Sequence, residues 1–191
     1  MAALIRHSPE LAIRTPEAPL LCGNTWLREA MVSTISVSRM IQAPAAHVWR
    51  LFTDLHHRSA WLSTVDHVEV ITGGDLRAGS VWRETRHMPD GARVTEEFRV
   101  EECDEGVRLV VSSPGIGADY RMTYTFTPVE EGRHRGDTVV TAVQVGTPLA
   151  ARGRLIALFL GGLAAVVSEG ALRHDLHDLE RAARRQLIEF T

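Results

Sequence analysis

The side chains of this sequence best suited to chemistry are a carboxylate, an imidazole and a guanidinium on two consecutive predicted strands. A hairpin turn at 90–91 would pair Thr85 with Glu96, which sets Glu96 diagonally between Arg83 and His87. The same pairing points these side chains toward the interior, where an unpartnered charge is costly. The three residues therefore form either a buried ionic network or one wall of a partly wet cavity.

In such a cavity the group could perform acid–base chemistry. Glu96 or His87 could move a proton in an enolisation, an aldol closure or a dehydration, while Arg83 or Tyr124 stabilises an oxyanion. We name Glu96 and His87 as the candidate catalytic residues. Three other interpretations stay open: the group only contacts a ligand, it is an internal ion pair with a neighbouring imidazole, or the strand register differs and the side chains face water.

Extending the hairpin pairing along the sheet predicts the rest of the inner face. Val111 is expected opposite Met122 and Tyr124 opposite Thr141, and Val100 opposite Leu109. With the C-terminal helix this gives candidate ligand contacts at Arg83, Thr85, Phe98, Val111, Tyr120, Met122, Tyr124, Thr141, Leu155, Leu158, Phe159 and Gly162. The opposite face of the same hairpin is predicted to be solvated, with Trp82, Glu84 and Arg86.

Local patterns predict the elements that would position these side chains. Alternating apolar residues bounded by Gly, Pro and Asp predict strands at 34–41, 65–72, 80–88, 93–102, 107–113, 120–128 and 138–145. Pro44 suits the first turn of a short helix, and a second short helix is expected over 56–62.

A long helix is expected over 148–187, because apolar residues recur there at spacings of three and four. Its segment 155–168 carries no charged residue on any side. That segment is shorter than the roughly 20 apolar residues of a membrane span, so it is predicted to be a buried wall. Gly161 and Gly162 inside it would permit a kink or a close approach.

Composition limits the classes of partner. The chain has 191 residues, a net charge of −3 and no block of four or more basic residues, which argues against nucleic acid. We predict a poorly ordered extension at 1–30 and one domain at 31–191. Because no export signal is seen, Cys22 and Cys103 are predicted to be free thiols and the protein cytoplasmic, without a transmembrane segment.

No metal or cofactor is predicted from the motifs. His174 and His177 stand three apart on the expected helix, but a stable zinc site requires about four ligands, and no further Cys or His pattern supplies them. His56 and His57 are adjacent and cannot both point at one ion, so they are interpreted as solvated.

The sequence at 41–49 (Ile-Gln-Ala-Pro-Ala-Ala-His-Val-Trp), followed by 51–54 and by Trp61-Leu62, resembles the start of polyketide cyclase/dehydrase-like proteins. These belong to the START-like (SRPBCC, Bet v 1-like) superfamily, and the resemblance covers about 32–187. It implies an α+β helix-grip fold: a curved, antiparallel, seven-stranded sheet wrapped around a long C-terminal helix, with two short helices after the first strand.

The resemblance also implies an apolar cavity between sheet and helix, since members bind lipids, sterols or polyketides and some are aromatases or cyclases. It supplies no shared catalytic residue. The expected function is binding of a small hydrophobic ligand in that cavity. The first alternative is a cyclase or dehydratase that uses the acid–base residues above, and the second is a protein-interaction module without a small ligand.

Overall fold

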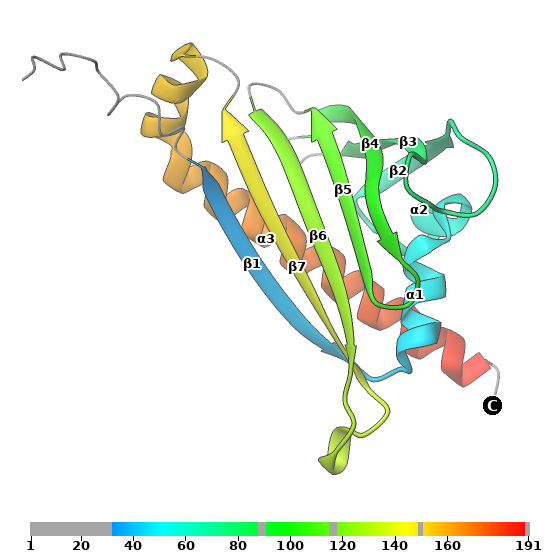
Figure 1. Ribbon diagram of the computed structural model, residues 1–191. Coiled ribbons are helices and arrows are strands. Elements are labelled where there is room, and N and C mark those ends of the chain that lie inside the picture. The colour runs from blue at the N-terminus through cyan, green and yellow to red at the C-terminus, as the bar shows by residue number, and fades with distance from the viewer. Residues whose placement is uncertain (1–31, 88–90, 115–117, 149–150, 190–191) are drawn as a thin grey trace, which may run out of the picture.

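A computed structural model of the chain describes residues 32–87, 91–114, 118–148 and 151–189, with side chains except at 148 and 151–168. The described residues form an antiparallel sheet of seven strands, short helices after the first strand, and one long C-terminal helix (Figure 1). The elements are β1 (Ser33–Ile41), α1 (Ala45–Thr53), η2 (Leu55–His57), α2 (Arg58–Trp61), β2 (Val65–Val70), β3 (Val81–His87), β4 (Arg93–Asp104), β5 (Arg108–Pro114), β6 (Ala118–Pro128), η3 (Gly132–His134), β7 (Thr138–Pro148) and α3 (Ala151–Glu189). The predicted α+β helix-grip class is confirmed.

Strands β2 to β7 form an antiparallel meander, and β1 forms one edge of the sheet. The strand order is β1-β7-β6-β5-β4-β3-β2, so β1 adds to the far side of β7. Helix α3 crosses one face of the sheet, and α1 and α2 lie at one end of the sheet beside the C-terminal half of α3 (Figure 1). The predicted extension at 1–30 lies outside the described residues.

The core forms where α1 and the C-terminal half of α3 meet the sheet. On α3, Leu172, Leu176, Leu179 and Ala183 are buried at the predicted three- and four-residue spacing. Helix α1 starts after Pro44 and buries Val48, Trp49, Leu51 and Phe52 on one side. The apolar spacing therefore predicted the packed face of α3 correctly where its side chains are described.

The predicted pairing of β3 with β4 is wrong by one residue. Trp82 lies opposite Phe98 and Glu84 opposite Glu96, because His87 pairs with Arg93. The connection 88–92 has an odd number of residues, whereas the predicted two-residue turn has an even number. Since side chains alternate along a strand, a shift of one residue turns the whole of β3 over.

As a consequence, Arg83, Thr85 and His87 lie on the outer face and not with Glu96. Arg83 donates to Glu97 at 3.1 Å, and the hydroxyls of Thr85 and Thr95 are 2.9 Å apart. His87 Nδ1 is 3.0 Å from Asp66. Each of the three side chains is at least partly exposed.

Two further registers differ from the prediction. Tyr124 pairs with Ala142, so Thr141 points outward and its hydroxyl is 2.9 Å from that of Ser38. A bulge in β4 between 100 and 102 sets Val100 opposite Val111 and not opposite Leu109. The partner of Val100 is thus shifted by two residues, and a shift of two leaves every side chain on its original face. Phe98 therefore stays on the inner face. The expected pair of Val111 with Met122 is confirmed.

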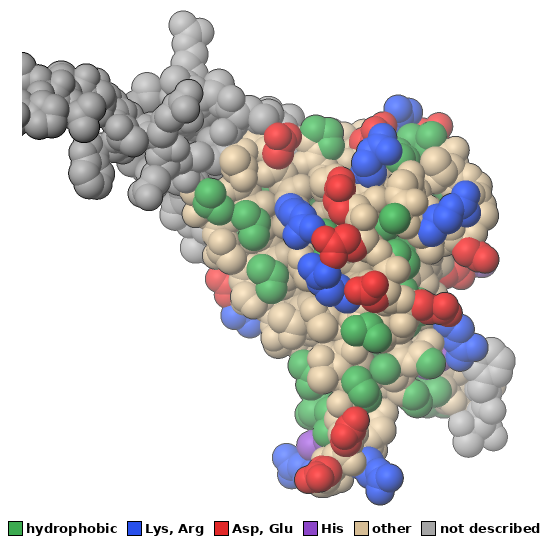
Figure 2. Space-filling view, viewed as in Figure 1, with side chains coloured by type: hydrophobic (Ala, Val, Ile, Leu, Met, Phe, Trp, Pro, Cys, Tyr) green, Lys and Arg blue, Asp and Glu red, His purple; other side chains and the backbone are tan. Residues whose placement is uncertain are grey.

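The sheet face turned to the viewer in Figure 2 carries arginine and acidic side chains mixed together. One such cluster joins Arg108 and Arg121 to the carboxylate of Glu102. Mixed signs of this kind form no basic stripe across the face. Within the described residues, no helix combines the length and the apolar composition needed to cross a membrane.

Candidate functional site

A cavity of about 310 Å³ lies between the inner face of the sheet and α3. This volume is at the lower end of the range typical of small-molecule pockets. Its described lining is mainly apolar with a polar minority: Phe52, Leu55, Arg58, Leu76, Trp82, Arg86, Val94, Glu96, Phe98, Leu109, Val111, Ser113, Tyr120, Met122, Tyr124, Gln144, Ala171, Leu172 and Asp175.

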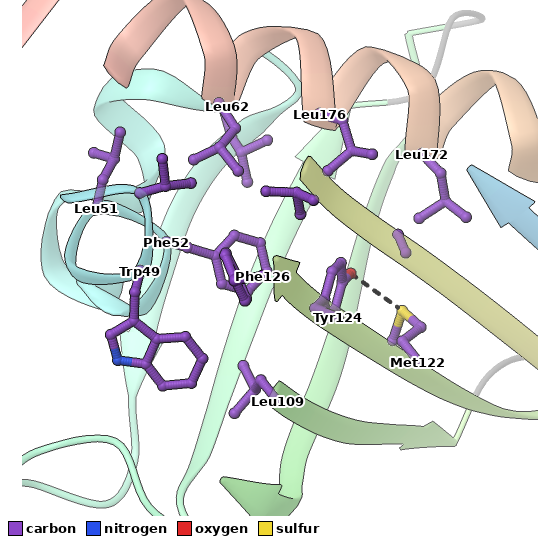
Figure 3. Close-up of a cluster of buried hydrophobic side chains, with 14 of the residues drawn as sticks. Trp49, Leu51, Phe52, Leu62, Leu109, Met122, Tyr124, Phe126, Leu172 and Leu176 are labelled. Atoms are coloured by element: carbon purple, nitrogen blue, oxygen red, sulfur yellow. Dashed lines mark hydrogen bonds between the residues drawn. The ribbon is translucent and has the colours of Figure 1, made fainter. Parts of the chain in front are cut away.

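The sheet side of the cavity changes from apolar to polar along the strands. Three cross-strand rows follow one another at about 7 Å per row. They are Leu109–Tyr124–Ala142, then Val111–Met122–Gln144, then Ser113–Tyr120–Gly146. Figure 3 shows Leu109, Met122 and Tyr124 projecting from the sheet toward Phe52 of α1 and Leu172 of α3. A bound molecule would therefore meet different chemistry at the two ends.

One side of the cavity is a buried ionic network that sequence reasoning missed. Arg58 Nε donates to Glu84 Oε1 at 2.5 Å, and Trp82 Nε1 donates to the same oxygen at 2.9 Å. Arg86 donates to Glu84 Oε2 through Nε at 3.0 Å and Nη2 at 2.9 Å, and to Asp175 Oδ2 through Nη1 at 2.9 Å. Strand β3 is thereby tied to both α2 and α3.

The network fixes the charge state of its members. Burial by itself would raise the pKa of Glu84, but the charges of Arg58 and Arg86 and the bonds from Trp82 and Arg86 outweigh it and hold that pKa at about 2. Burial acts to lower the pKa of Arg86, and Asp175 and Glu84 reverse this and raise it. The Glu84 carboxylate and the Arg86 guanidinium are therefore ionised at neutral pH.

Aromatic rings enclose the network. The guanidinium carbon of Arg58 lies 4.9 Å from the ring centroid of Phe52 and 5.5 Å from that of Trp61, both within cation–π range. Trp82 stacks on Phe98 with centroids 5.3 Å apart. These contacts hold the polar side of the cavity in a single arrangement.

Glu96 faces the cavity from β4 without an ion-pair partner among the described residues. Burial raises its pKa, the charge of Arg86 opposes this rise, and the nearby Glu84 adds to it. The Tyr124 hydroxyl donates only to the weak acceptor Met122 Sδ, at 3.7 Å, as Figure 3 shows. Burial raises the pKa of Tyr124 to about 12 although the charge of Arg58 opposes the rise, so this group stays a donor.

Three buried polar atoms lack a hydrogen-bond partner among the described residues: Ser113 Oγ, Trp61 Nε1 and Asp175 Oδ1. Ser113 is 2% exposed and lines the large cavity. Trp61 and Asp175 both line a separate void of about 10 Å³ between α2 and α3, next to the network. Buried polar atoms are normally paired, so both places are suited to a polar guest.

The structure brings together only part of the predicted site. Glu96, Phe98, Val111, Tyr120, Met122 and Tyr124 line the cavity, whereas Arg83, Thr85, His87 and Thr141 lie on the other face of the sheet. Leu155, Leu158, Phe159 and Gly162 lie in the part of α3 that is described by its backbone alone. Contact of the six lining residues with a ligand stays a prediction.

The missed residues carried one usable signal. Trp82, Glu84 and Arg86 alternate along β3, and a large aromatic side chain at the head of such a set favours the buried face. Arg58 and Asp175 offered no comparable signal, because their roles depend on how α2 and α3 pack against that strand.

The histidines and cysteines hold no metal site in the described part of the chain, where no group of three or more His, Cys, Asp or Glu is suitably placed. His174 Nε2 is 2.7 Å from Ser63 Oγ, and His177 Nδ1 is 2.8 Å from Arg39. Cys103 is a free thiol, and Cys22 lies outside the described residues.

A sheet that encloses a cavity against one long helix defines a helix-grip protein. The chain belongs to the family described as polyketide cyclase / dehydrase and lipid transport, whose sequence model matches residues 33–184. The resemblance seen in the sequence is thereby confirmed. Among curated proteins, none matches the sequence significantly.

Solved structures show the same fold at low sequence identity. TTHA0849 from Thermus thermophilus superposes with a TM-score of 0.65 at 22% identity, covering 81% of this chain and 99% of that one. The Zhui aromatase/cyclase from a Streptomyces species gives 0.64 at 15% identity, covering 82% and 96%. A START superfamily protein from Mycobacterium smegmatis gives 0.64 at 12% identity, covering 80% and 98%.

Proposed function

We propose that this protein binds a small hydrophobic ligand in the cavity between the sheet and α3. The observation that carries the proposal is the 310 Å³ cavity itself, which is lined by apolar side chains and flanked by one fixed polar side. Membership of a family that includes lipid transport supports the same assignment. Burying apolar ligand surface there would contribute about 25 cal/mol per Å² before the cost of association.

The ionic network supports this proposal because it offers a reason why the cavity stays open. Arg58, Glu84 and Arg86 are held by hydrogen bonds from three elements, so the side chains beside the cavity cannot collapse into it without breaking charged contacts. A core selected only for packing would be filled to high density. The enclosed space therefore favours a binding role over a purely structural one.

A second candidate function is catalysis, favoured by Glu96. A carboxyl group with a raised pKa inside a cavity is suited to proton transfer, and the Tyr124 hydroxyl could donate to a developing oxyanion. This version of the cyclase or dehydratase hypothesis uses neither His87 nor Arg83, since both lie on the outer face.

The binding proposal is tested by mass spectrometry of organic extracts from the purified protein. We expect a reproducible hydrophobic species that is lost in Val111→Trp, since this substitution fills the middle row of the cavity. Val107→Trp is the matched control, because Val107 is 56% exposed. Absence of any species, together with no uptake of small apolar probes, would contradict the proposal and favour the protein-interaction module.

The two candidate functions are separated at Glu96. If the extracted species is a substrate, Glu96→Gln should lower its turnover by orders of magnitude, whereas a carrier should lose only a modest part of its affinity. His87→Ala and Glu97→Gln serve as controls from the outer face of the same two strands.

A further inference from the structure

Each described positive charge that lines the cavity is already neutralised. Arg58 pairs with Glu84, and Arg86 pairs with both Glu84 and Asp175. Arg86 uses Nε, Nη1 and Nη2 in these contacts and in a bond from Nη1 to Thr64 at 3.3 Å. The charge of each guanidinium is therefore already balanced by a carboxylate.

The charge balance of the site is neutral or negative. The two arginines are matched by Glu84 and Asp175, and Glu96 is left over on the cavity lining. A carboxylate ligand would enter beside Glu96 with no described cation to pair with it. An uncompensated charge in such a place is strongly disfavoured.

The cavity also offers two polar groups that have no protein partner among the described residues. Ser113 Oγ is fully buried, and the Glu96 carboxylate is half-buried on the cavity lining. Arg99 of β4 pairs with Ser112 of β5, so the next residues along the two strands, Phe98 and Ser113, face each other. Glu96 is the next residue after Phe98 that points inward, which makes it a diagonal neighbour of Ser113. Diagonal neighbours of this kind are separated by about 7–8 Å, with one small group able to reach both.

A hydroxyl group fits this pair, because it can donate to the Glu96 carboxylate and accept from the Ser113 hydroxyl at once. A hydrocarbon would leave both unpaired, and a carboxylate would repel Glu96. We infer that the cavity selects an uncharged apolar molecule bearing a hydroxyl group, held between Glu96 and Ser113, and discriminates against carboxylic acids. This inference rests on the proposed function.

Three probes with the same apolar body test it: 4-hexylphenol, 4-hexylbenzoate and hexylbenzene, titrated calorimetrically at pH 7.5. We expect 4-hexylphenol to bind about fivefold tighter than hexylbenzene and at least roughly tenfold tighter than 4-hexylbenzoate. Equal or tighter binding of the benzoate would overturn the inference. Failure of all three probes to bind would instead overturn the proposed function, and this inference with it.

Variants locate the effect. Ser113→Ala should weaken 4-hexylphenol about fivefold and leave hexylbenzene unchanged. Glu96→Gln removes the negative charge and should tighten 4-hexylbenzoate roughly tenfold. Ser112→Ala and Glu97→Gln are matched controls, since both residues lie on the same strands but point to the outer face, where they contact Glu101 and Arg83.

Circular dichroism of each variant confirms folding before titration. Ser113→Ala removes an unpaired buried hydroxyl, so no loss of stability is expected from it. A phenol-to-hexylbenzene affinity ratio that is the same in Ser113→Ala as in the unmodified protein would overturn the assignment of Ser113.

Discussion

At the residue scale, Glu84 is the centre of the buried network. It is 1% exposed and accepts hydrogen bonds from Arg58, Trp82 and Arg86. Glu84→Gln would leave two guanidinium groups facing an amide whose N–H₂ also donates. We expect a loss of about 3–5 kcal/mol in the free energy of unfolding, measured in urea.

Glu97→Gln is the control for that measurement, because Glu97 forms an exposed pair with Arg83 on the neighbouring face. A change of at most about 1 kcal/mol is expected there. A loss below about 1 kcal/mol in Glu84→Gln as well would mean that the network contributes little to stability.

Acid should weaken the fold through the same residue. The pKa of Glu84 is lowered from 4.5 to about 2, so the folded protein binds fewer protons than the unfolded chain between these values. Its contribution, about 3 kcal/mol, is complete above pH 5 and is lost as the pH falls toward 2. Urea unfolding between pH 7 and pH 3 measures the slope, and Glu84→Gln should remove most of it.

Glu96 acts in the opposite direction. Its pKa is raised in the folded state, so the folded protein holds that proton more tightly and gains relative stability when Glu96 becomes protonated. Glu96→Gln should therefore make the acid-induced loss of stability steeper than in the unmodified protein. A shallower loss in this variant would contradict the raised pKa.

At the element scale, the buried face of a helix or strand could be predicted where the pattern of apolar residues extends over many positions. The helix period over α3 and the alternation within each strand each sum several residues, and the buried face of α3 was predicted correctly where its side chains are described. Which face of β3 points inward depended on the length of one loop, 88–92. Because β3 pairs with β4 one residue away from the predicted register, the buried charge on β3 is Glu84 and not Arg83.

The same reasoning explains which site residues were found. Phe98, Val111, Met122 and Tyr124 lie on strands whose parity was right, so they line the cavity as expected. The prediction that Thr141 lines the cavity was wrong, because β6 and β7 pair one residue away from the predicted register. Arg58 on α2 reaches Glu84, and Asp175 on α3 reaches Arg86, through long-range packing, which no local period encodes.

The C-terminal half of α3 is fastened to the corner between α2 and β2. Asp178 is 3% exposed and accepts from the Ser63 amide at 2.9 Å and from its hydroxyl at 2.6 Å. Burial would raise the pKa of Asp178, but the bonds from Ser63 and the charges of His174 and Arg181 lower it. The carboxylate is therefore the ionised acceptor of this contact at neutral pH.

Asp178→Asn should loosen that corner. We expect a cost of about 1–3 kcal/mol and faster hydrogen exchange of the Ser63 amide, because the bond to that amide weakens. Arg173→Ala is the control on the same helix, since Arg173 is exposed and pairs with Glu169 among the described residues. Unchanged exchange at Ser63 would contradict the role given to Asp178.

At the scale of the whole molecule, the described side chains of α3 have two kinds of surroundings. Leu179 and Ala183 pack into the core that contains Phe52 and Phe126, while Leu172 and Asp175 line the cavity. Residues of the core and of the ionic network thus line the cavity without filling it. Occupying that space should stabilise the whole domain, since only the folded state possesses it.

This stabilisation can be measured as a shift in Tm. With 4-hexylphenol at 100 times its Kd, mass action adds about 2.7 kcal/mol to the free energy of unfolding. For a domain of this size that corresponds to a rise of roughly 5–10 °C. Val111→Trp fills the middle row of the cavity and should abolish the rise, whereas Val107→Trp should keep it, because Val107 is exposed at the surface. An equal rise in both variants would place the binding site outside the cavity.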